Sequence, residues 1–341
     1  MEPHVPRLAV QYVRRTADYL RTLGVTTEAW LAKSGVAPDA LDDPEAVFRL
    51  DVFAELSRNA VEMSGEPALG IVVGSTLVTS THGALGQAAM SAASMSEVLE
   101  LLRRFIASRI SVLALNHAVE GERVRLEIRE LLPIGYPRTM VLEAVMLSVR
   151  NVLQDASMGT CQLLGAEFPF PTPEYLELAE EAFGCPLQFD SPRACFWIPR
   201  ATLERPPRMA DPRALELAAR LCERELDTLG SGRSFEIRVR RIMLERPQGF
   251  PSFPAVARRL HITPRTLDRR LRSEDTSYRT ILDDLRQRMA TDHLESGTTI
   301  DEIAYLLGYT DTANFRRAFR RWTGSPPSSF RREPNAKRRL E

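Results

Sequence analysis

Lysine is almost absent from this chain of 341 residues: Lys33 and Lys337 are the only two, so nearly all of the positive charge is arginine. The four cysteines form no CxxC pair, and the five histidines occur in no HExxH motif or comparable ligand spacing. The sequence therefore gives no sign of a zinc site or a thiol redox centre. We expect reduced, buried thiols, no metal and no cofactor.

Long apolar runs are also absent. No segment approaches the roughly 20 apolar residues of a membrane-spanning helix, and the first 15 residues lack the basic-then-apolar order of a secretory signal. There is no GxSxG motif and no glycine-rich phosphate loop, and adjacent carboxylates such as Asp42 and Asp43 form no acid/base pair. We therefore expect a cytoplasmic protein that contacts no membrane and is not an enzyme.

The net charge of zero hides an uneven distribution. Residues 231–341 contain 23 Arg and Lys against 14 Asp and Glu, whereas residues 1–230 contain 22 against 31. A basic C-terminal third joined to an acidic remainder suggests a polyanion as the partner of the C-terminal part alone. The stretch Gly230-Ser231-Gly232 coincides with the change of sign, and we place a domain boundary there.

The acidic N-terminal part combines two periodicities. Apolar residues at a spacing of three and four predict several helices, the clearest over 96–109 with Ser96 as its N-cap. Apolar and charged residues then alternate from 123 to 129, after the turn Glu120-Gly121-Glu122, which predicts a hairpin with the strand 112–119. Helices and hairpins without a βαβ repeat indicate an α+β domain.

Residues 252–273 are typical of a helix-turn-helix unit. Thr263 is a good N-cap for the second helix, Pro264 suits its first position, and Leu267 and Leu271 face inward. An arginine-rich outward face on that second helix is what reading of the major groove requires. The candidate DNA-binding residues here are Arg265, Thr266, Asp268, Arg269 and Arg272.

The pattern recurs in residues 299–323. Thr299 and Glu302 form a capping box, Gly308 ends the first helix, and Asp311 caps the second. Phe315, Ala318, Phe319 and Trp322 supply its buried face. The candidate DNA-binding residues of this unit are Thr312, Ala313, Asn314, Arg316, Arg317 and Arg320.

A longer helix over 278–295 separates the two units and would act as a rigid spacer. It would let both second helices enter successive major grooves, about 34 Å apart. The first helix, with its dense arginine face, would anchor phosphates, and the second would do more of the base reading. Residues 334–341 form a basic tail that adds only non-specific attraction.

Several of these residues have a second interpretation. The arginines could form a solvated basic face, but two capped units favour DNA contact. Asn314 could pair with adenine or stabilise the start of its helix, and Asp268 could accept from cytosine or orient Arg272. The aromatic residues at helical spacing predict a core and not a stacking platform. In the N-terminal part, His82 and His117 are candidates for an effector pocket, although a lone histidine is more often a surface or core residue.

Arg103, Arg104 and Arg109 lie on or beside the helix 96–109. They could bind a carboxylate, but a solvated face is the preferred interpretation.

The C-terminal segment resembles the DNA-binding domain of the AraC/XylS family of bacterial transcription regulators. The residues that carry the resemblance are ARRLHITPRTLDRRLR, then ATDHLESG at the end of the spacer, and IDEIAYLLGYTDTANFRRAFRRWTGSPPSSFRR. Phe330 stands where the family usually has tyrosine, which should leave the packing face intact. Residues 43–105 are similar to the effector-binding domain of the subgroup that includes regulators of ornithine utilisation. They do not look like the sugar-binding β-barrel of the arabinose regulators.

The resemblance implies an α+β effector-binding and dimerisation domain over 1–230 and an all-α DNA-binding domain over 231–333. Its expected partners are double-stranded promoter DNA, an unidentified small-molecule effector and a second copy of the chain, with RNA polymerase as a further candidate. Arabinose is not carried over as the ligand. We expect an activator, although the residues do not decide between activation and repression.

Two other classes of function are weaker alternatives. An enzyme with a DNA-binding appendage, like some repair methyltransferases, needs a nucleophilic or metal-ligating cysteine cluster. Such close spacing is lacking in Cys161, Cys185, Cys195 and Cys222. An architectural DNA binder without a ligand would have no cavity in its N-terminal domain.

Overall fold

The computed structural model describes residues 7–43, 46–205, 207, 209–230, 235–244, 249–295 and 298–330. The chain divides into two compact units, Glu2–Arg233 and Ser234–Glu341. The basic tail expected over 334–341 lies outside the described residues. No helix in the described part is long and apolar enough to cross a membrane.

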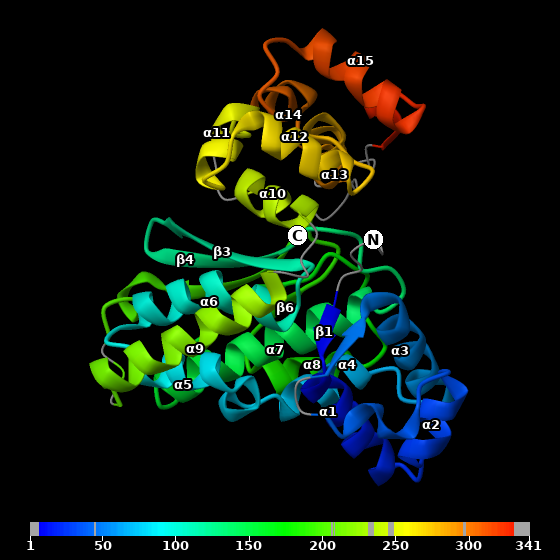
Figure 1. Ribbon diagram of the computed structural model, residues 1–341, viewed down its shortest axis with the longest axis vertical. Helices are drawn as coiled ribbons and strands as arrows, with labels where there is room; N and C mark the ends of the chain where they lie inside the picture. The colour runs from blue at the N-terminus through cyan, green and yellow to red at the C-terminus, as the bar shows by residue number, and fades with distance from the viewer. Residues whose placement is uncertain are drawn as a thin grey trace, which may run out of the picture. The chain divides into compact units, whose positions relative to one another are not determined.

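The N-terminal unit contains helices and two sheets (Figure 1), and is the α+β domain that the sequence predicts. Its helices are α1 (Val10–Thr22), α2 (Thr27–Lys33), α3 (Leu50–Ser64), α4 (Leu69–Thr76), α5 (Ala84–Ser91), α6 (Met95–Arg109), α7 (Arg138–Ala156), α8 (Leu176–Phe183) and α9 (Pro212–Gly230). Its strands are β1 (Arg7–Ala9), β2 (Val47–Arg49), β3 (Leu113–Glu120), β4 (Arg123–Glu130), β5 (Gly165–Glu167), β6 (Leu187–Gln188) and β7 (Ala194–Pro199). Short 3-10 helices cover Pro38–Leu41, Thr79–His82 and Arg200–Thr202.

The larger sheet has the strand order β3-β4-β7-β5-β6 and is antiparallel except for the pair β5 and β6. The alternation along β4 decides which face is buried: Val124, Leu126 and Ile128 face the core, while the charged residues between them are half-buried on the other face. Helices α5, α6, α7 and α9 lie together on one side of the β3–β4 hairpin (Figure 1). Their apolar faces and the inner face of the sheet form one core.

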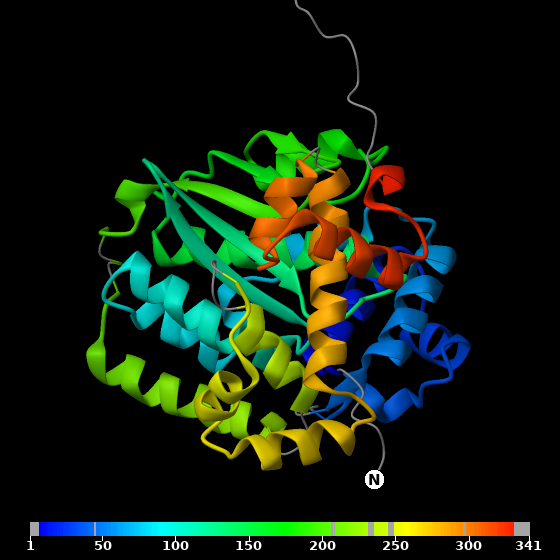
Figure 2. The ribbon, with the colours of Figure 1, turned by 90° about the horizontal axis from the view of Figure 1, so that it is seen from above.

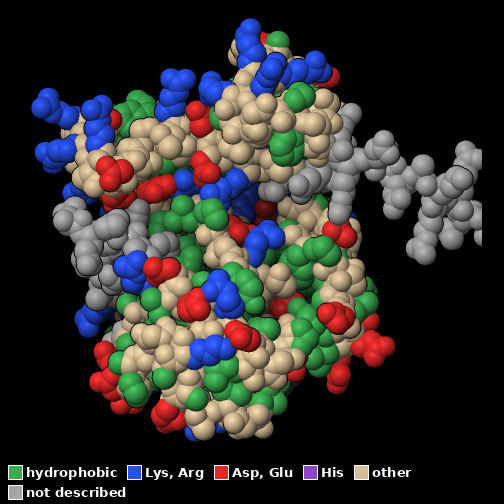
Figure 3. Space-filling view, turned by 90° about the vertical axis from the view of Figure 1, so that its right-hand side faces the viewer, with side chains coloured by type: hydrophobic (Ala, Val, Ile, Leu, Met, Phe, Trp, Pro, Cys, Tyr) green, Lys and Arg blue, Asp and Glu red, His purple; other side chains and the backbone are tan. Residues whose placement is uncertain are grey.

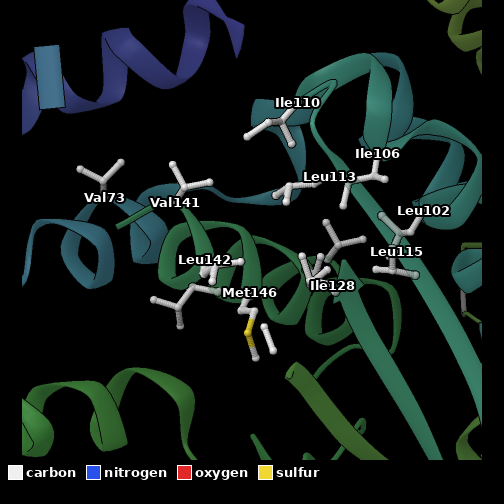
Figure 4. Packing of buried hydrophobic residues seen from close by; sticks show 14 of the residues in the cluster. Val73, Leu102, Ile106, Ile110, Leu113, Leu115, Ile128, Val141, Leu142 and Met146 are labelled. Carbon is white, nitrogen blue, oxygen red and sulfur yellow. The ribbon is translucent and has the colours of Figure 1, made fainter. Parts of the chain in front are cut away.

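Apolar side chains of α6 and β3 converge on those of α7 in this core (Figure 4). Helix α4 also approaches α7 very closely, because α4 carries glycine where the two helices cross. A Cβ on Gly74 would lie 2.8 Å from the Cα of Ala144, so a larger residue would separate the helices. Helix α7 therefore packs against both α4 and the core formed by α6 and β3.

One detail of the sequence-based prediction was wrong. Helix α6 begins at Met95, and its N-cap is Ser94, whose hydroxyl accepts a hydrogen bond from the backbone N–H of Glu97 at 3.2 Å. Ser96, the expected cap, lies inside the first turn. Both serines precede the same apolar series, and only the backbone conformation of Ser94, which is extended, distinguishes the cap.

The described elements of the C-terminal unit are helical, as expected. They are α10 (Phe235–Leu244), α11 (Phe253–Arg259), α12 (Pro264–Arg272), α13 (Tyr278–Glu295), α14 (Ile300–Leu306), α15 (Thr312–Thr323) and a 3-10 helix, Pro327–Phe330. Helices α11 and α12 form one helix-turn-helix, and α14 and α15 form the other. Figure 2 shows α13 running between these two pairs.

Helix α13 takes part in the packing of both pairs. Near its start, Ile281 and Leu285 are buried, and the Tyr278 ring packs edge-on against Phe253 of α11 at 5.4 Å. Near its end, Ala290 and Leu294 belong to the core that α14 and α15 build. The two helix-turn-helix units are thus joined through a shared structural element and not through a loop.

Candidate nucleic-acid interface and ligand cavity

Helix α12 is built to expose one face. The Thr263 hydroxyl accepts a hydrogen bond from the backbone N–H of Thr266 at 3.2 Å, and Pro264 occupies the first position. Leu267 and Leu271 are buried, so the helix packs through that side. Of the residues expected to face DNA, Arg265, Arg269 and Arg272 are exposed, and Thr266 and Asp268 are half-buried.

Helix α15 follows the same plan. The Asp311 carboxylate accepts a hydrogen bond from the backbone N–H of Asn314 at 2.6 Å, and the capping box of Thr299 and Glu302 is present on the preceding helix. Phe315, Ala318 and Phe319 are buried. The expected contact residues Ala313, Arg316, Arg317 and Arg320 are exposed, whereas Thr312 and Asn314 are half-buried.

The exposed arginines differ in their partners. Arg272 pairs with Asp268 at 3.0 Å, and Arg317 donates a hydrogen bond to the side-chain oxygen of Asn314 at 2.6 Å. Four others have no acidic partner in the described part of the chain: Arg265 and Arg269 on α12, and Arg316 and Arg320 on α15. Unpaired guanidinium groups can bind phosphate without first losing an ion pair. In Figure 3, arginine side chains gather in separate clusters on this unit.

Asn314 and Asp268 both have internal roles in the protein without DNA. The Asn314 amide nitrogen donates to the Asp311 carboxylate, and its oxygen accepts from Arg317, so the residue braces the start of α15. Asp268 holds Arg272 in an i, i+4 pair. Contact of either residue with a base would require exchange of these bonds.

The aromatic residues of α15 belong to the core, as expected. Phe315 and Phe319 are fully buried, and Trp322 packs against Phe319 and Tyr309. The Phe330 ring lies edge-on against Phe319 at 5.2 Å. A tyrosine hydroxyl is therefore not needed for this packing.

The N-terminal unit contains a cavity of about 70 Å³ between α1, α4, α6 and α7. Its wall is mostly aliphatic; Ile106 and Val141, both labelled in Figure 4, are among the lining residues. The polar side chains on the wall are those of Tyr12, Thr16, His82, Arg109 and Ser148.

His82 lies at the centre of the polar part. Its Nδ1 is 3.2 Å from the Tyr12 hydroxyl, and its Nε2 is 2.9 Å from the Ser148 hydroxyl. Burial, together with the positive charge of Arg109, lowers the pKa of His82 to about 4, so the ring is neutral at pH 7. The sequence signal for His82 alone was too weak to place it here.

Arg109 corrects another expectation. Its side chain is only 12% exposed and lines the cavity, so it is not part of a solvated face. One terminal nitrogen, Nη2, donates to Glu225 of α9 at 2.6 Å, while the Nε atom is buried without a hydrogen-bond partner. Arg103 and Arg104 do lie at the surface, paired with Glu100 and Glu223. His117 lies on β3, outside the cavity wall.

The four cysteines are buried and unbridged, as expected. Burial raises the pKa of Cys161, Cys185 and Cys222 to about 11, and raises that of Cys195 further. Their thiols are therefore protonated and poorly nucleophilic at neutral pH. No group of three or more His, Cys, Asp or Glu in the described residues is arranged to hold a metal ion.

Comparison with known proteins identifies the family. The family model of the arabinose-binding N-terminal domain of AraC transcription regulators matches residues 24–207, and a helix-turn-helix model matches residues 256–333. The chain belongs to the AraC family of transcription regulators. The C-terminal unit of this AraC-family protein binds DNA, and its N-terminal unit is a ligand-binding domain.

Relatives of this AraC-family chain match over nearly its whole length. It is 33% identical to the ornithine utilization regulator of Pseudomonas aeruginosa, with 95% of this chain and 96% of the relative covered. It is 28% identical to an uncharacterised helix-turn-helix regulator, Rv1395, of Mycobacterium tuberculosis, with 97% and 98% covered. The crystal structure of the transcriptional regulator CdpR from Pseudomonas aeruginosa matches with 24% identity and a TM-score of 0.44, covering 92% of this chain and 97% of that one.

Proposed function

We propose that α12 and α15 enter successive major grooves on one side of promoter DNA. The observation that carries this proposal is the position of α13, which contacts α11 through the Tyr278 and Phe253 rings and shares a core with α14 and α15. This helix connects the two helix-turn-helix units and so limits changes in their separation. Successive major grooves on one side of the duplex are about 34 Å apart. The contact residues are Arg265, Thr266, Asp268, Arg269, Arg272, Thr312, Ala313, Asn314, Arg316, Arg317 and Arg320.

In this proposal α12 mainly contacts phosphates and α15 mainly contacts bases. Helix α12 exposes Arg265 and Arg269 without acidic partners, which suits phosphate anchoring. Helix α15 presents the small Ala313 and the amide of Asn314 at its start, where a recognition helix meets base edges. Arg317, already aligned by Asn314, would contact a base beside it.

The test begins with an operator selected by the full-length protein from a random duplex pool. Affinities of Arg269→Ala and Arg317→Ala are then measured on that operator and on single-base variants of it, over a range of salt. Loss of a base contact should cost about 1–3 kcal/mol and relax preference at one position, whereas loss of a phosphate contact should weaken all sequences alike. Arg220→Ala, at an exposed arginine of α9, is the control. Wild-type affinity and preference in both variants would refute the assignments.

The regulation that we propose has a small-molecule effector in the N-terminal unit and a homodimer as the binding species. An effector can shift the equilibrium only if it binds one arrangement of the protein better than another. The cavity supports a ligand-responsive regulator over an architectural DNA binder. RNA polymerase is a candidate partner for activation, and a cytoplasmic location is part of the proposal, supported by the expected DNA target.

An enzymatic role has little support. A repair methyltransferase would need a reactive or zinc-bound cysteine, and burial keeps all four thiols protonated. A zinc assay on the purified protein provides the check, since stoichiometric bound zinc would revive this alternative.

A further inference from the structure

The described wall of the cavity contains a positively charged side chain and no negatively charged one. Of the 19 lining residues, five have polar side chains and none is acidic. Arg109 carries the permanent charge, because the neighbouring His82 is neutral at pH 7. An anion is therefore the charged ligand that the described wall can accept, and an ammonium group would find no carboxylate there.

Arg109 has unused capacity to donate hydrogen bonds. Its Nη2 donates to Glu225, but its buried Nε has no acceptor. A buried N–H without a partner destabilises the protein, because it has lost its hydrogen bond to water and gained none in return. A carboxylate is the ligand group that best removes this cost, since its two oxygens match two parallel N–H groups of a guanidinium.

The rest of the wall determines what the carboxylate is attached to. Aliphatic side chains such as Leu102, Ile106 and Val149 line it, so the remainder of the ligand is apolar. The cavity volume is about 70 Å³, below the roughly 150 Å³ of a cavity that holds benzene. These sizes favour an acid with fewer non-hydrogen atoms than benzene, that is, one of about two or three carbons.

We propose that this cavity binds a short apolar monocarboxylic acid, whose carboxylate pairs with Arg109 in competition with Glu225 of α9. This inference rests on the proposed function, in which the N-terminal unit binds the effector. Helix α9 is the last helix of that unit before the chain enters the DNA-binding unit. Release of Glu225 therefore changes how the end of α9 is held when the acid binds.

The same wall argues against a basic amino acid as the effector. L-Ornithine carries two ammonium groups, and the described lining offers no carboxylate to either of them. The relative that regulates ornithine utilization thus need not share its effector with this chain.

The structure provides a matched control for Arg109. Arg104 also lies on α6 and also pairs with a glutamate of α9, Glu223, at 2.6 Å, but it does not line the cavity. Arg104→Gln breaks an ion pair between the same two helices and leaves the cavity unchanged. Arg109→Gln breaks the other pair and removes the anion partner as well.

The experiment measures binding to the full-length protein without DNA, by thermal shift and calorimetry. The probes are straight-chain acids from acetate to decanoate, the matching primary alcohols and amines, and L-ornithine. We expect an acid of two or three carbons to bind at least ten times more tightly than its alcohol or amine. Arg109→Gln should lose at least ten-fold in affinity, and Arg104→Gln less than two-fold. Glu225→Gln should bind the acid several-fold more tightly, because the competing carboxylate is gone.

Opposite results would overturn the inference: no binding of any acid, an optimum beyond three carbons, equal losses in the two arginine variants, or preference for L-ornithine. If Arg109→Gln is unfolded by circular dichroism, the Glu225→Gln result decides. Operator affinity is measured separately on the same proteins without ligand. Normal DNA binding with no acid binding defeats this inference alone, whereas acid binding without operator binding defeats the proposed DNA contacts.

Discussion

Arg240 of α10, with a side chain only 6% exposed, forms an ion pair with Glu236 in its own helix at 2.7 Å and another with Asp284 of α13. The guanidinium thus connects the first helix of the DNA-binding unit to the helix that spans it. Asp284 also pairs with Arg288 at 3.2 Å. Because the arginine is buried, its removal leaves two carboxylates without their shared cation.

Arg240→Met should therefore destabilise the DNA-binding unit. Breaking a fully buried ion pair costs roughly 3–5 kcal/mol, and partial exposure of Glu236 and Asp284 reduces this to about 2–3 kcal/mol. Arg220→Met is the control, since Arg220 pairs with Glu216 at the same i, i+4 spacing but both are about 65% exposed. It should cost less than about 0.5 kcal/mol. Urea unfolding followed by circular dichroism measures both, and equal effects would contradict the buried role.

The two helix-turn-helix units reach a left-handed backbone conformation at equivalent positions with different residues. Gly308 has φ +76° after α14, while His261 has φ +53° after α11. Left-handed backbone costs a side-chain-bearing residue roughly 1 kcal/mol, and glycine very little. His261→Gly should therefore raise the free energy of unfolding slightly, and Gly308→Ala should lower it by about 1 kcal/mol. Changes of the same sign in both variants would show that the turns are not equivalent.

Glu143 of α7 is buried, and burial raises the pKa of its carboxyl to about 8. Its Oε1 accepts a hydrogen bond from the Tyr175 hydroxyl at 2.9 Å, while Oε2 is buried without a partner. In the unfolded chain the carboxyl ionises near pH 4.5. Between these values the folded state binds more protons, so this group lowers stability as the pH rises from about 4.5 to about 8.

Glu143→Gln removes the ionisable carboxyl and keeps nearly the same side-chain shape. The difference in unfolding free energy between the variant and the wild type should grow in favour of the variant from pH 5 to pH 8, by a few kcal/mol at most. Denaturant unfolding at several pH values gives this difference. A difference that does not change with pH would mean that Glu143 titrates normally in the folded protein.

Substitution of Asp268 can show whether this residue holds Arg272 or contacts a cytosine. If it serves to hold Arg272, then Asp268→Ala removes a negative charge from α12, the helix proposed to face DNA, and frees an arginine. Affinity for non-specific duplex DNA should then rise several-fold at low salt. If Asp268 reads a cytosine, affinity for the selected operator should fall by at least five-fold. Glu216→Ala, with the same change of charge on α9, controls for net charge.

The DNA-binding unit was more predictable from sequence than the ligand-binding unit, because its signals are local. Caps such as Thr263 and Asp311 and the following apolar series determine helix starts within a few residues. Helix α10 was not predicted: Phe235, Ile237 and Val239 alternate with charged residues as in a strand. A tertiary contact stabilises the helix instead, because Arg240 forms an ion pair with Asp284 of α13.

The cavity could not be predicted in the same way. Its lining residues come from elements spread along the chain, among them α1, α4, α6 and α7, which only the tertiary fold brings together. Arg109 looked like a surface residue because it ends an amphipathic helix, and its burial depends on α9, more than a hundred residues later. His82 had no partner in sequence either; Tyr12 and Ser148 are 70 and 66 positions away.

The connection of the two helix-turn-helix units through α13 has a consequence for the search for operators in a genome. A base pair inserted between the two halves of an operator would turn the second groove by about 34° and move it by about 3.4 Å. If α12 and α15 enter successive grooves as proposed, the protein could follow only by breaking the Tyr278–Phe253 contact or by opening the core to which Leu294 belongs. Operators should therefore tolerate substitutions between their halves but not a change in their spacing. A genome can be searched with a pattern of fixed gap.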